Sequence, residues 1–241
     1  MGCSAKAALT AMLCSFAFTS LISCGGGGSS SGGGGGTTPV AAPAQTIVSG
    51  TVQTPGGAIV FFKKPGFGDL FVSEAYAALT GLANVPDNTI VQLARLNTTA
   101  TSFSVISTTT TSSGRYSFNL SVLGIQPAND LIVRVAGPSG REMRAFVVGT
   151  VADISPASEA GYQLAIQSLN GGPINNLTLQ EVGDISGAVA LIAVLQNIGN
   201  ATSVDQAVGL VRSAVGANAQ VTGFIASAAG SGQTTQGAGD V

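Results

Sequence analysis

A run of twelve residues made only of glycine and serine, residues 25–36, separates a short leader from the rest of the chain. Such a segment cannot bury enough apolar surface to offset the entropy lost on ordering, so it behaves as a flexible coil. Residues 37–44 continue it with two prolines. We therefore expect residues 24–44 to be a tether, and its glycine-serine run to have a root-mean-square reach of about 20 Å. Any fold must form downstream of it.

The leader, residues 1–23, has the organisation of a signal peptide. A short positively charged start, residues 1–6, is followed by a mostly apolar stretch at residues 7–22. This stretch is too short and too rich in serine and threonine for a comfortable membrane span. The sequence therefore predicts export, although an uncleaved anchor stays open as an alternative.

The junction Leu21-Ile22-Ser23-Cys24 resembles the processing site of bacterial lipoproteins. That motif has an aliphatic residue, a small or aliphatic residue, a small residue and then cysteine. The resemblance implies cleavage between Ser23 and Cys24, and lipid attachment at Cys24 by a thioether to diacylglycerol and by further acyl chains such as palmitate. Each methylene buried in the bilayer contributes about 0.8 kcal/mol to anchoring. Glycine rather than aspartate follows Cys24, which implies the outer membrane of a Gram-negative bacterium. An ordinary signal peptide with a chance cysteine remains the alternative.

Charge and cysteine content indicate which ligands the chain is unsuited to bind and how its fold is stabilised. Only 8% of residues are charged, and the net charge of −2 is unevenly divided. Residues 37–148 hold seven basic and five acidic residues, whereas residues 149–241 hold one basic and six acidic residues. The basic residues are scattered singly, which disfavours nucleic-acid binding. All three cysteines lie in the first 24 residues, so the cleaved chain has no disulfide and depends on its core for stability.

Residues 45–149 are predicted to form a β-sandwich. Short runs rich in β-branched residues alternate with turn residues, which is typical of antiparallel strands. About seven strands are expected, and a tight turn at residues 112–114 and another at 137–140 indicate hairpins. The expected strands are 46–52, 58–62, 89–96, 103–111, 115–120, 131–136 and 142–148.

This β half resembles the carboxypeptidase regulatory-like domain, a transthyretin-like sandwich. The motifs that carry the resemblance are Val48-Ser49-Gly50-Thr51-Val52, Val85-Pro86-Asp87 ahead of Val91, and the stretch from Thr110 to Phe118 with its G-x-Y-x-F pattern. The resemblance implies an accessory module without peptidase activity. The sequence departs from the family between Val52 and Val91, where the usual connection is short. The longer connection here includes an aromatic segment at residues 57–85, interpreted as a strand and a short helix (73–82) that cover one end of the sandwich, or else as an exposed partner site.

Residues 150–229 change to helical periodicity and predict a small bundle of three to four helices. Ser155, Thr178 and Ser203 are expected to cap three of them. In the second helix, Val182, Ile185, Val189 and Ile192 form one apolar stripe, and Leu191, Val194, Leu195 and Ile198 occupy the other side. That helix is therefore predicted to be buried all round in its second half. Residues 230–241 are predicted to be a disordered tail.

The chain offers few groups for catalysis. Histidine is absent, which removes the commonest general base and most zinc sites. Two pairs of acids are the nearest in sequence, Glu181 with Asp184 and Asp153 with Glu159. The spacing of Glu181 and Asp184 at a helix start is explained by the helix dipole, and Glu159 lies in the first turn of the helix that Ser155 is expected to cap. We therefore expect no catalytic, metal-binding or cofactor-binding residues, and no enzyme activity.

The resulting expectation is an α+β chain, an antiparallel sandwich followed by a helical bundle, held at the membrane through Cys24. Its predicted role is that of a non-catalytic envelope lipoprotein that binds an envelope protein or polymer. The alternative is an accessory module that binds a carbohydrate or another ligand.

Overall fold

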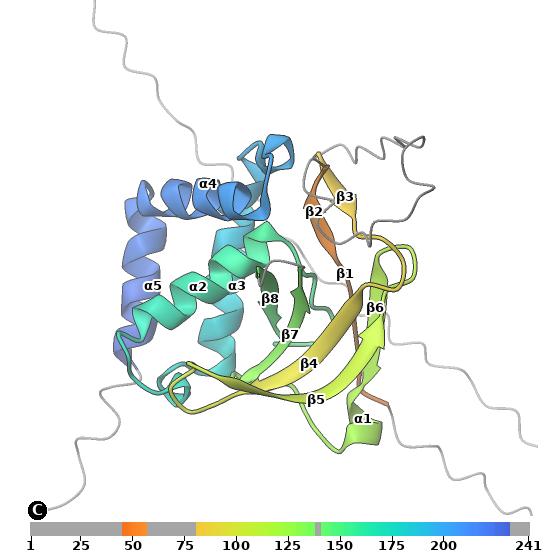
Figure 1. Ribbon diagram of the computed structural model, residues 1–241. Coiled ribbons are helices and arrows are strands. Elements are labelled where there is room, and N and C mark those ends of the chain that lie inside the picture. Colours follow the sequence, from red (N-terminus) through yellow and green to blue (C-terminus); the bar gives the residue numbers. More distant parts are fainter. Residues whose placement is uncertain (1–44, 57–80, 138–140, 232–241) are drawn as a thin grey trace, which may run out of the picture. The chain divides into compact units, whose positions relative to one another are not determined.

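Four antiparallel strands form the largest sheet of the computed structural model, which describes residues 45–56, 81–137 and 141–231. Across the sheet the order is β5 (Phe103–Thr110), β4 (Ile90–Leu96), β7 (Leu131–Ala136) and β8 (Glu142–Phe146), as Figure 1 shows. In β7 the consecutive residues Leu131, Ile132 and Val133 are all fully buried. Because successive side chains of a strand point to opposite faces, both faces of the sheet are covered at β7.

Two smaller sheets, each of two antiparallel strands, complete the β half. One pairs β1 (Ile47–Thr51) with β6 (Arg115–Asn119), and the other pairs β2 (Gln53–Pro55) with β3 (Leu82–Asn84). Residues 150–154 run parallel to β1, where Ser49 N donates to Thr150 O at 3.0 Å and Ile154 N to Thr51 O at 2.8 Å. The chain thus returns to β1 before the helices begin, and the described residues belong to one compact unit.

Gly50 is required by this return of the chain. A Cβ atom at Gly50 would lie 2.1 Å from the carbonyl oxygen of Ala152. The same oxygen accepts a hydrogen bond from the Tyr116 hydroxyl. Burial, and then the charge of Asp153, raise the pKa of Tyr116 above its ordinary value, so this hydroxyl stays a donor. The backbone at Ala152 therefore leaves no room for a side chain at position 50, which explains the glycine in the first strand motif.

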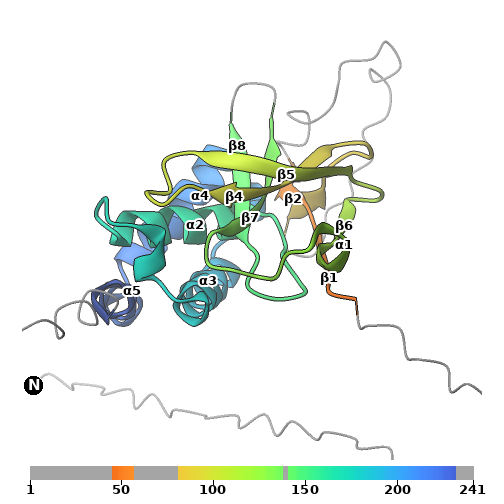
Figure 2. The same cartoon turned by 90° about the horizontal axis from the view of Figure 1, so that it is seen from below.

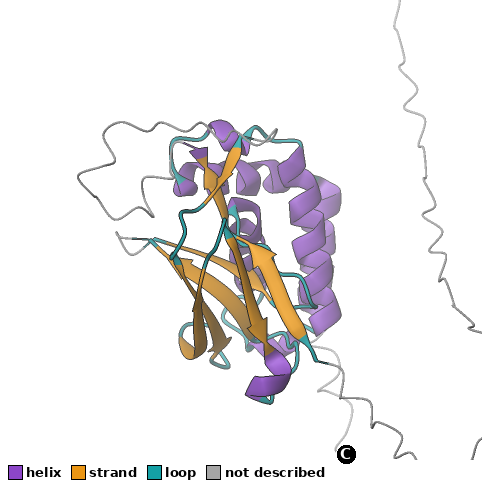
Figure 3. Cartoon of the chain, turned by 90° about the vertical axis from the view of Figure 1, so that its right-hand side faces the viewer, coloured by secondary structure: helices purple, strands orange, loops and turns teal. Residues whose placement is uncertain are grey.

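The helical half is built around α2 (Pro156–Ser168), which packs on β8 and on the three other long helices. Those helices are α3 (Leu179–Val194), α4 (Val204–Gly216) and α5 (Ala219–Ser231), and Figure 3 shows them gathered on one side of the strands. The short helices are α1 (Leu120–Leu123), η2 (Ile174–Asn176) and η3 (Ile198–Asn200). Phe146 of β8 and Tyr162 of α2 have ring centroids 5.2 Å apart, which ties the bundle to the sheet.

The three predicted helix caps are confirmed. The side chains of Ser155, Thr178 and Ser203 each accept a hydrogen bond from the backbone N–H three residues later. Each bond satisfies one of the N–H groups that a helix start leaves without an intrahelical partner. The fourth predicted helix is also present, and α5 ends at Ser231.

The α+β class and the antiparallel pairing are as predicted. A sandwich of about seven strands is not confirmed, because the described strands form small sheets of two, two and four strands. The predicted strand 115–120 ends one residue early, because Leu120 begins the short helix α1. The predicted strand 58–62 and nearly all of the predicted helix 73–82 lie outside the described residues, and Leu82 belongs to β3.

The two predicted hairpins have different outcomes. The second is confirmed, because β7 and β8 pair antiparallel. At residues 112–114 the tight turn forms, with reciprocal hydrogen bonds of 2.9 Å between Ser112 and Arg115 and positive φ angles at Ser113 and Gly114. The strands that flank this turn, however, do not pair with each other, because β5 pairs with β4 and β6 with β1. The turn carries the chain from one sheet to another.

The prediction that the second half of α3 is buried all round is wrong. Val182, Ile185 and Val189 are fully buried, and Ala193 nearly so. On the other predicted side, Leu191, Val194 and Leu195 are 69%, 78% and 74% exposed, whereas Ile198, which belongs to η3, is buried. Only one stripe of α3 meets the other described elements, so an apolar sequence on every side was not enough to bury every side.

Candidate interaction surface

Cys24 and Ser23, the predicted lipid-attachment and cleavage residues, lie outside the described residues. Their roles therefore remain predictions from the sequence motif. None of the described helices combines the length and the apolar character that crossing a membrane requires. The described part of the chain also contains no cluster of three or more side chains suited to hold a metal ion.

The acidic pair at the start of α3 has local partners. Glu181 Oε2 accepts hydrogen bonds from Thr178 N at 2.7 Å and from Thr178 Oγ1 at 2.9 Å, which completes a capping box. Asp184 Oδ1 accepts from Gln180 Nε2 at 2.8 Å. These contacts agree with a role at the helix start.

Sequence reasoning missed a buried ion pair between β8 and α2. Glu159 is only 2% exposed, and its Oε2 accepts from the backbone N of Arg144 at 2.8 Å and from Arg144 Nε at 3.0 Å. Its Oε1 meets Arg144 Nη2 at 2.5 Å and accepts from Gln163 Nε2 at 2.8 Å. The Arg144 guanidinium also lies over the Tyr162 ring, 4.0 Å from its centroid. We call Arg144 and Glu159 the central ion pair.

A second arginine lies beside the central ion pair. Arg134 of β7 is the cross-strand neighbour of Arg144, which places two like charges side by side. Glu142 lies between them, with one carboxylate oxygen 2.7 Å from Arg134 Nη2 and the other 3.2 Å from Arg144 Nη1. Two carboxylates thus compensate two guanidinium groups at the contact between sheet and bundle.

This arrangement favours a structural role over a chemical one. Burial alone would lower the pKa of Arg144, but the hydrogen bond and charge of Glu159 outweigh it and raise that pKa above its ordinary value. Burial raises the pKa of Tyr162, and Arg144 opposes that rise. Because both oxygens of Glu159 already accept two hydrogen bonds or close contacts, this carboxylate has no open position for a substrate.

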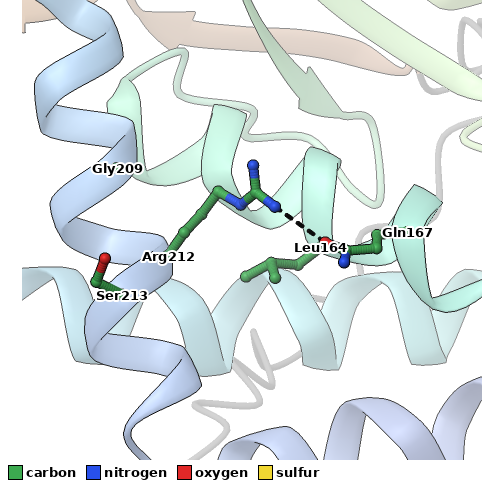
Figure 4. A pocket seen from close by; sticks show the side chains of 5 residues that line it. All are labelled: Leu164, Gln167, Gly209, Arg212 and Ser213. Atoms are coloured by element: carbon green, nitrogen blue, oxygen red, sulfur yellow. Dashed lines mark hydrogen bonds between the residues drawn. The ribbon is translucent and has the colours of Figure 1, made fainter.

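An open hollow of about 430 Å³ lies between α2 and α4 (Figure 4). Arg212, the single basic residue after residue 149, lines it together with Leu164, Gln167, Gly209 and Ser213. Arg212 Nη1 donates to Gln163 Oε1 at 2.9 Å and Nη2 to Gln167 Oε1 at 3.0 Å. The guanidinium therefore fastens α4 to α2 through neutral amides and leaves its positive charge without a carboxylate in these contacts.

The exposed aliphatic residues at the end of α3 form a different kind of feature. Leu191, Val194 and Leu195 follow an i, i+3, i+4 spacing, which places their side chains on one face of the helix. No charged residue lies between residues 185 and 204. Complete burial of each such side chain against a partner would contribute about 1.5–3 kcal/mol. We call these three residues the α3 apolar patch.

Comparison with known proteins adds no relative. No protein-family model matches the chain, and neither the curated proteins nor the solved structures yielded a match. The likeness to the carboxypeptidase regulatory-like domain therefore remains a prediction from three sequence motifs.

The missed residues had only weak signals in the sequence. The sequence places Glu159 in the first turn of a helix, where it is followed by Ala160, Gly161 and Tyr162, all of which are buried. An acid at the head of an apolar helix stretch is a candidate for a buried pair, but its partner, fifteen residues earlier in β8, has no recognisable spacing. For the patch residues, the sequence shows that they are apolar but not that they are exposed.

Proposed function

We propose that this chain is a lipid-anchored, non-catalytic binding module of the bacterial cell envelope, and that it recognises a protein partner through the α3 apolar patch. Attachment is through Cys24, supported by the 21–24 motif and the glycine-serine tract that follows it. The observation that carries the binding role is the exposure of Leu191, Val194 and Leu195 together on one helix face. Contiguous apolar groups on a surface are typical of interaction sites.

A protein partner fits the patch better than a bilayer does. Helices that lie on membranes carry lysine or arginine on their polar face, and α3 has neither. Its charged residues are Glu181 and Asp184, and residues 149–241 carry six acids against Arg212. This negative balance opposes approach to anionic headgroups, whereas an uncharged protein surface meets no such barrier.

The finer prediction for the β half also remains part of the proposal. A sandwich of about seven strands related to the carboxypeptidase regulatory-like domain is supported by its motif strands, since Val48–Thr51 and Arg115–Phe118 pair side by side. The parallel segment 150–154 extends that pair. The alternative function, binding of a carbohydrate or other small ligand, has the Arg212 hollow as its support.

The anchoring part is tested with Cys24→Ala. The wild-type chain is expected to incorporate labelled palmitate and to fractionate with membranes. The variant should accumulate as an unlabelled precursor of higher mass. A variant that still matures and partitions into membranes unchanged would show that the lipoprotein prediction is wrong.

The binding part is tested with a photo-crosslinking amino acid at Leu195 in the membrane-bound chain. Val122 on α1 is the matched control, because it is an aliphatic residue of similar exposure, 76%, on a different element. We expect Leu195 to give one discrete protein adduct, Val122 to give none, and Leu191→Lys to abolish the Leu195 adduct. Adducts to lipid alone, or equal protein adducts from both positions, would contradict a protein-binding patch.

A further inference from the structure

Strand β5 forms one edge of the four-stranded sheet and has no strand on its outer side among the described residues (Figure 2). It is the longest strand described, with eight residues. None of the eight is buried, and Val105 is 46% exposed. Half of the backbone N–H and C=O groups of an edge strand point away from the sheet, so β5 presents a row of groups able to pair with another strand.

Apart from one bulge, β5 lacks the usual devices that protect a sheet edge. Proteins blunt exposed edges with lysine, proline or other charges, with β-bulges, or by covering them. Residues 103–114 contain no charged residue and no proline. The opposite edge differs, because β8 carries Glu142 and Arg144 and is covered by α2. The β8 edge of the sheet is thus charged and covered by a helix, whereas the β5 edge is uncharged and has no covering strand among the described residues.

One irregularity limits which part of β5 can pair. The register with β4 shifts between Leu93 and Ala94, which face Ser107 and Val105, so Ile106 is the extra residue of a bulge. A bulge bends its strand and interrupts regular pairing. From Ser107 to Thr110 the register with β4 is continuous. The regular part of the open edge is therefore Ser107-Thr108-Thr109-Thr110.

We propose that this edge pairs antiparallel with the same edge of a second copy of the chain. In a two-fold antiparallel pair, each residue of one strand faces a residue of the identical strand. Because residues 103–114 are uncharged, no register places like charges opposite each other. Threonine opposite threonine or serine adds favourable cross-strand contacts. The result is one continuous sheet of eight strands across the two copies.

The β5 edge and the α3 apolar patch lie on different elements, and pairing of two β5 edges requires neither the patch nor lipid attachment. The partner also differs, because it is a second copy of the chain. The variant that tests it must therefore leave both α3 and Cys24 unchanged. Thr108→Lys meets this condition, because Thr108 is exposed on β5 and a lysine there places like charges close together across the two-fold axis.

The experiment compares the full-length chain with its Thr108→Lys and Thr150→Lys variants by sedimentation equilibrium in one mild detergent. Thr150 is an exposed threonine outside β5, so its variant carries the same added charge at a different place. Cys24 is unchanged in all three proteins, so lipid attachment would affect them equally. We expect a dimer for the wild type and for Thr150→Lys, and at least a tenfold weaker dimer for Thr108→Lys. Hydrogen exchange at residues 107–110 of the wild type should slow as the protein concentration rises.

Three outcomes would overturn the proposal. The first is a wild-type chain that stays monomeric at all concentrations. The second is a dimer that Thr108→Lys and Thr150→Lys weaken equally, because association would then lie elsewhere. The third is strong protection of residues 107–110 that does not depend on concentration, because another segment of the same chain would then cover the edge.

Discussion

Two regions of the molecule differ in which residues they bury. One is the interface between sheet and bundle, and the other is the end of α3. At the interface, Glu159 is buried and forms an ion pair with the partly buried Arg144. At the end of α3, Leu191, Val194 and Leu195 lie in solvent. The contrast shows that in this chain the presence of a partner element, more than the polarity of the residue, decides what is buried. Glu159 has complementary donors on β8 and α2, whereas no described element packs over the three aliphatic side chains.

The largest expected effect comes from breaking the central ion pair. Glu159→Ala leaves the Arg144 guanidinium largely buried beside Arg134, with Glu142 as its remaining carboxylate. Removing one partner of a buried pair typically costs about 3–5 kcal/mol of unfolding free energy. Urea denaturation followed by circular dichroism measures this loss.

The double variant Arg144→Met with Glu159→Leu is the control for that measurement. Replacing both partners by apolar residues of similar size is often nearly neutral, so most of the stability should return. If the double variant is as unstable as Glu159→Ala, the charges themselves, beyond their mutual compensation, are needed at this interface.

A smaller effect separates the two faces of α3. Ile185 is fully buried and Leu191 is 69% exposed on the same helix. Ile185→Ala should cost about 2–5 kcal/mol because it leaves a cavity in the core. Leu191→Ala should change stability by less than about 0.5 kcal/mol. Thermal unfolding of the two variants compares them directly, and a large loss for Leu191→Ala would mean that the patch is covered in the free chain.

The smallest effect tests how open the exposed face of α3 is. Gly187 lies one turn before Leu191, and a Cβ atom there would meet no atom within 4 Å. Gly187→Ala should therefore stabilise the chain by about 0.5–1 kcal/mol, since alanine loses less conformational entropy in a helix. Gly161→Ala in α2, where Cβ would approach Ser186 Cα at 3.7 Å, should gain less. Destabilisation by Gly187→Ala would indicate a neighbour over this face.

Local features of the fold were predictable from the sequence because their causes are local. The caps at Ser155, Thr178 and Ser203 depend on atoms three residues away. The turn at residues 112–114 depends on two residues that tolerate positive φ. Strand pairing failed at that turn because the partners of β5 and β6 are chosen by distant segments, and turn geometry contains no information about them.

The candidate surface was only partly predictable for the same reason. Leu191, Val194 and Leu195 were recognised as apolar, but an uninterrupted apolar run does not reveal which face meets the core. The central ion pair needs knowledge that α2 lies on β8. Since Arg144 and Glu159 belong to different elements, no periodicity connects them.

The hydrogen bond from Gly56 N to Gly81 O, 3.2 Å long, has a consequence for how this fold can vary. It joins the two ends of the 57–80 segment at one point, and Gly81 is held there against Gly199. Because Gly56 and Gly81 already lie within hydrogen-bonding distance, residues can be added between them while β2 and β3 keep their register. Position 57–80 is therefore the natural place to graft a reporter or an epitope into this chain.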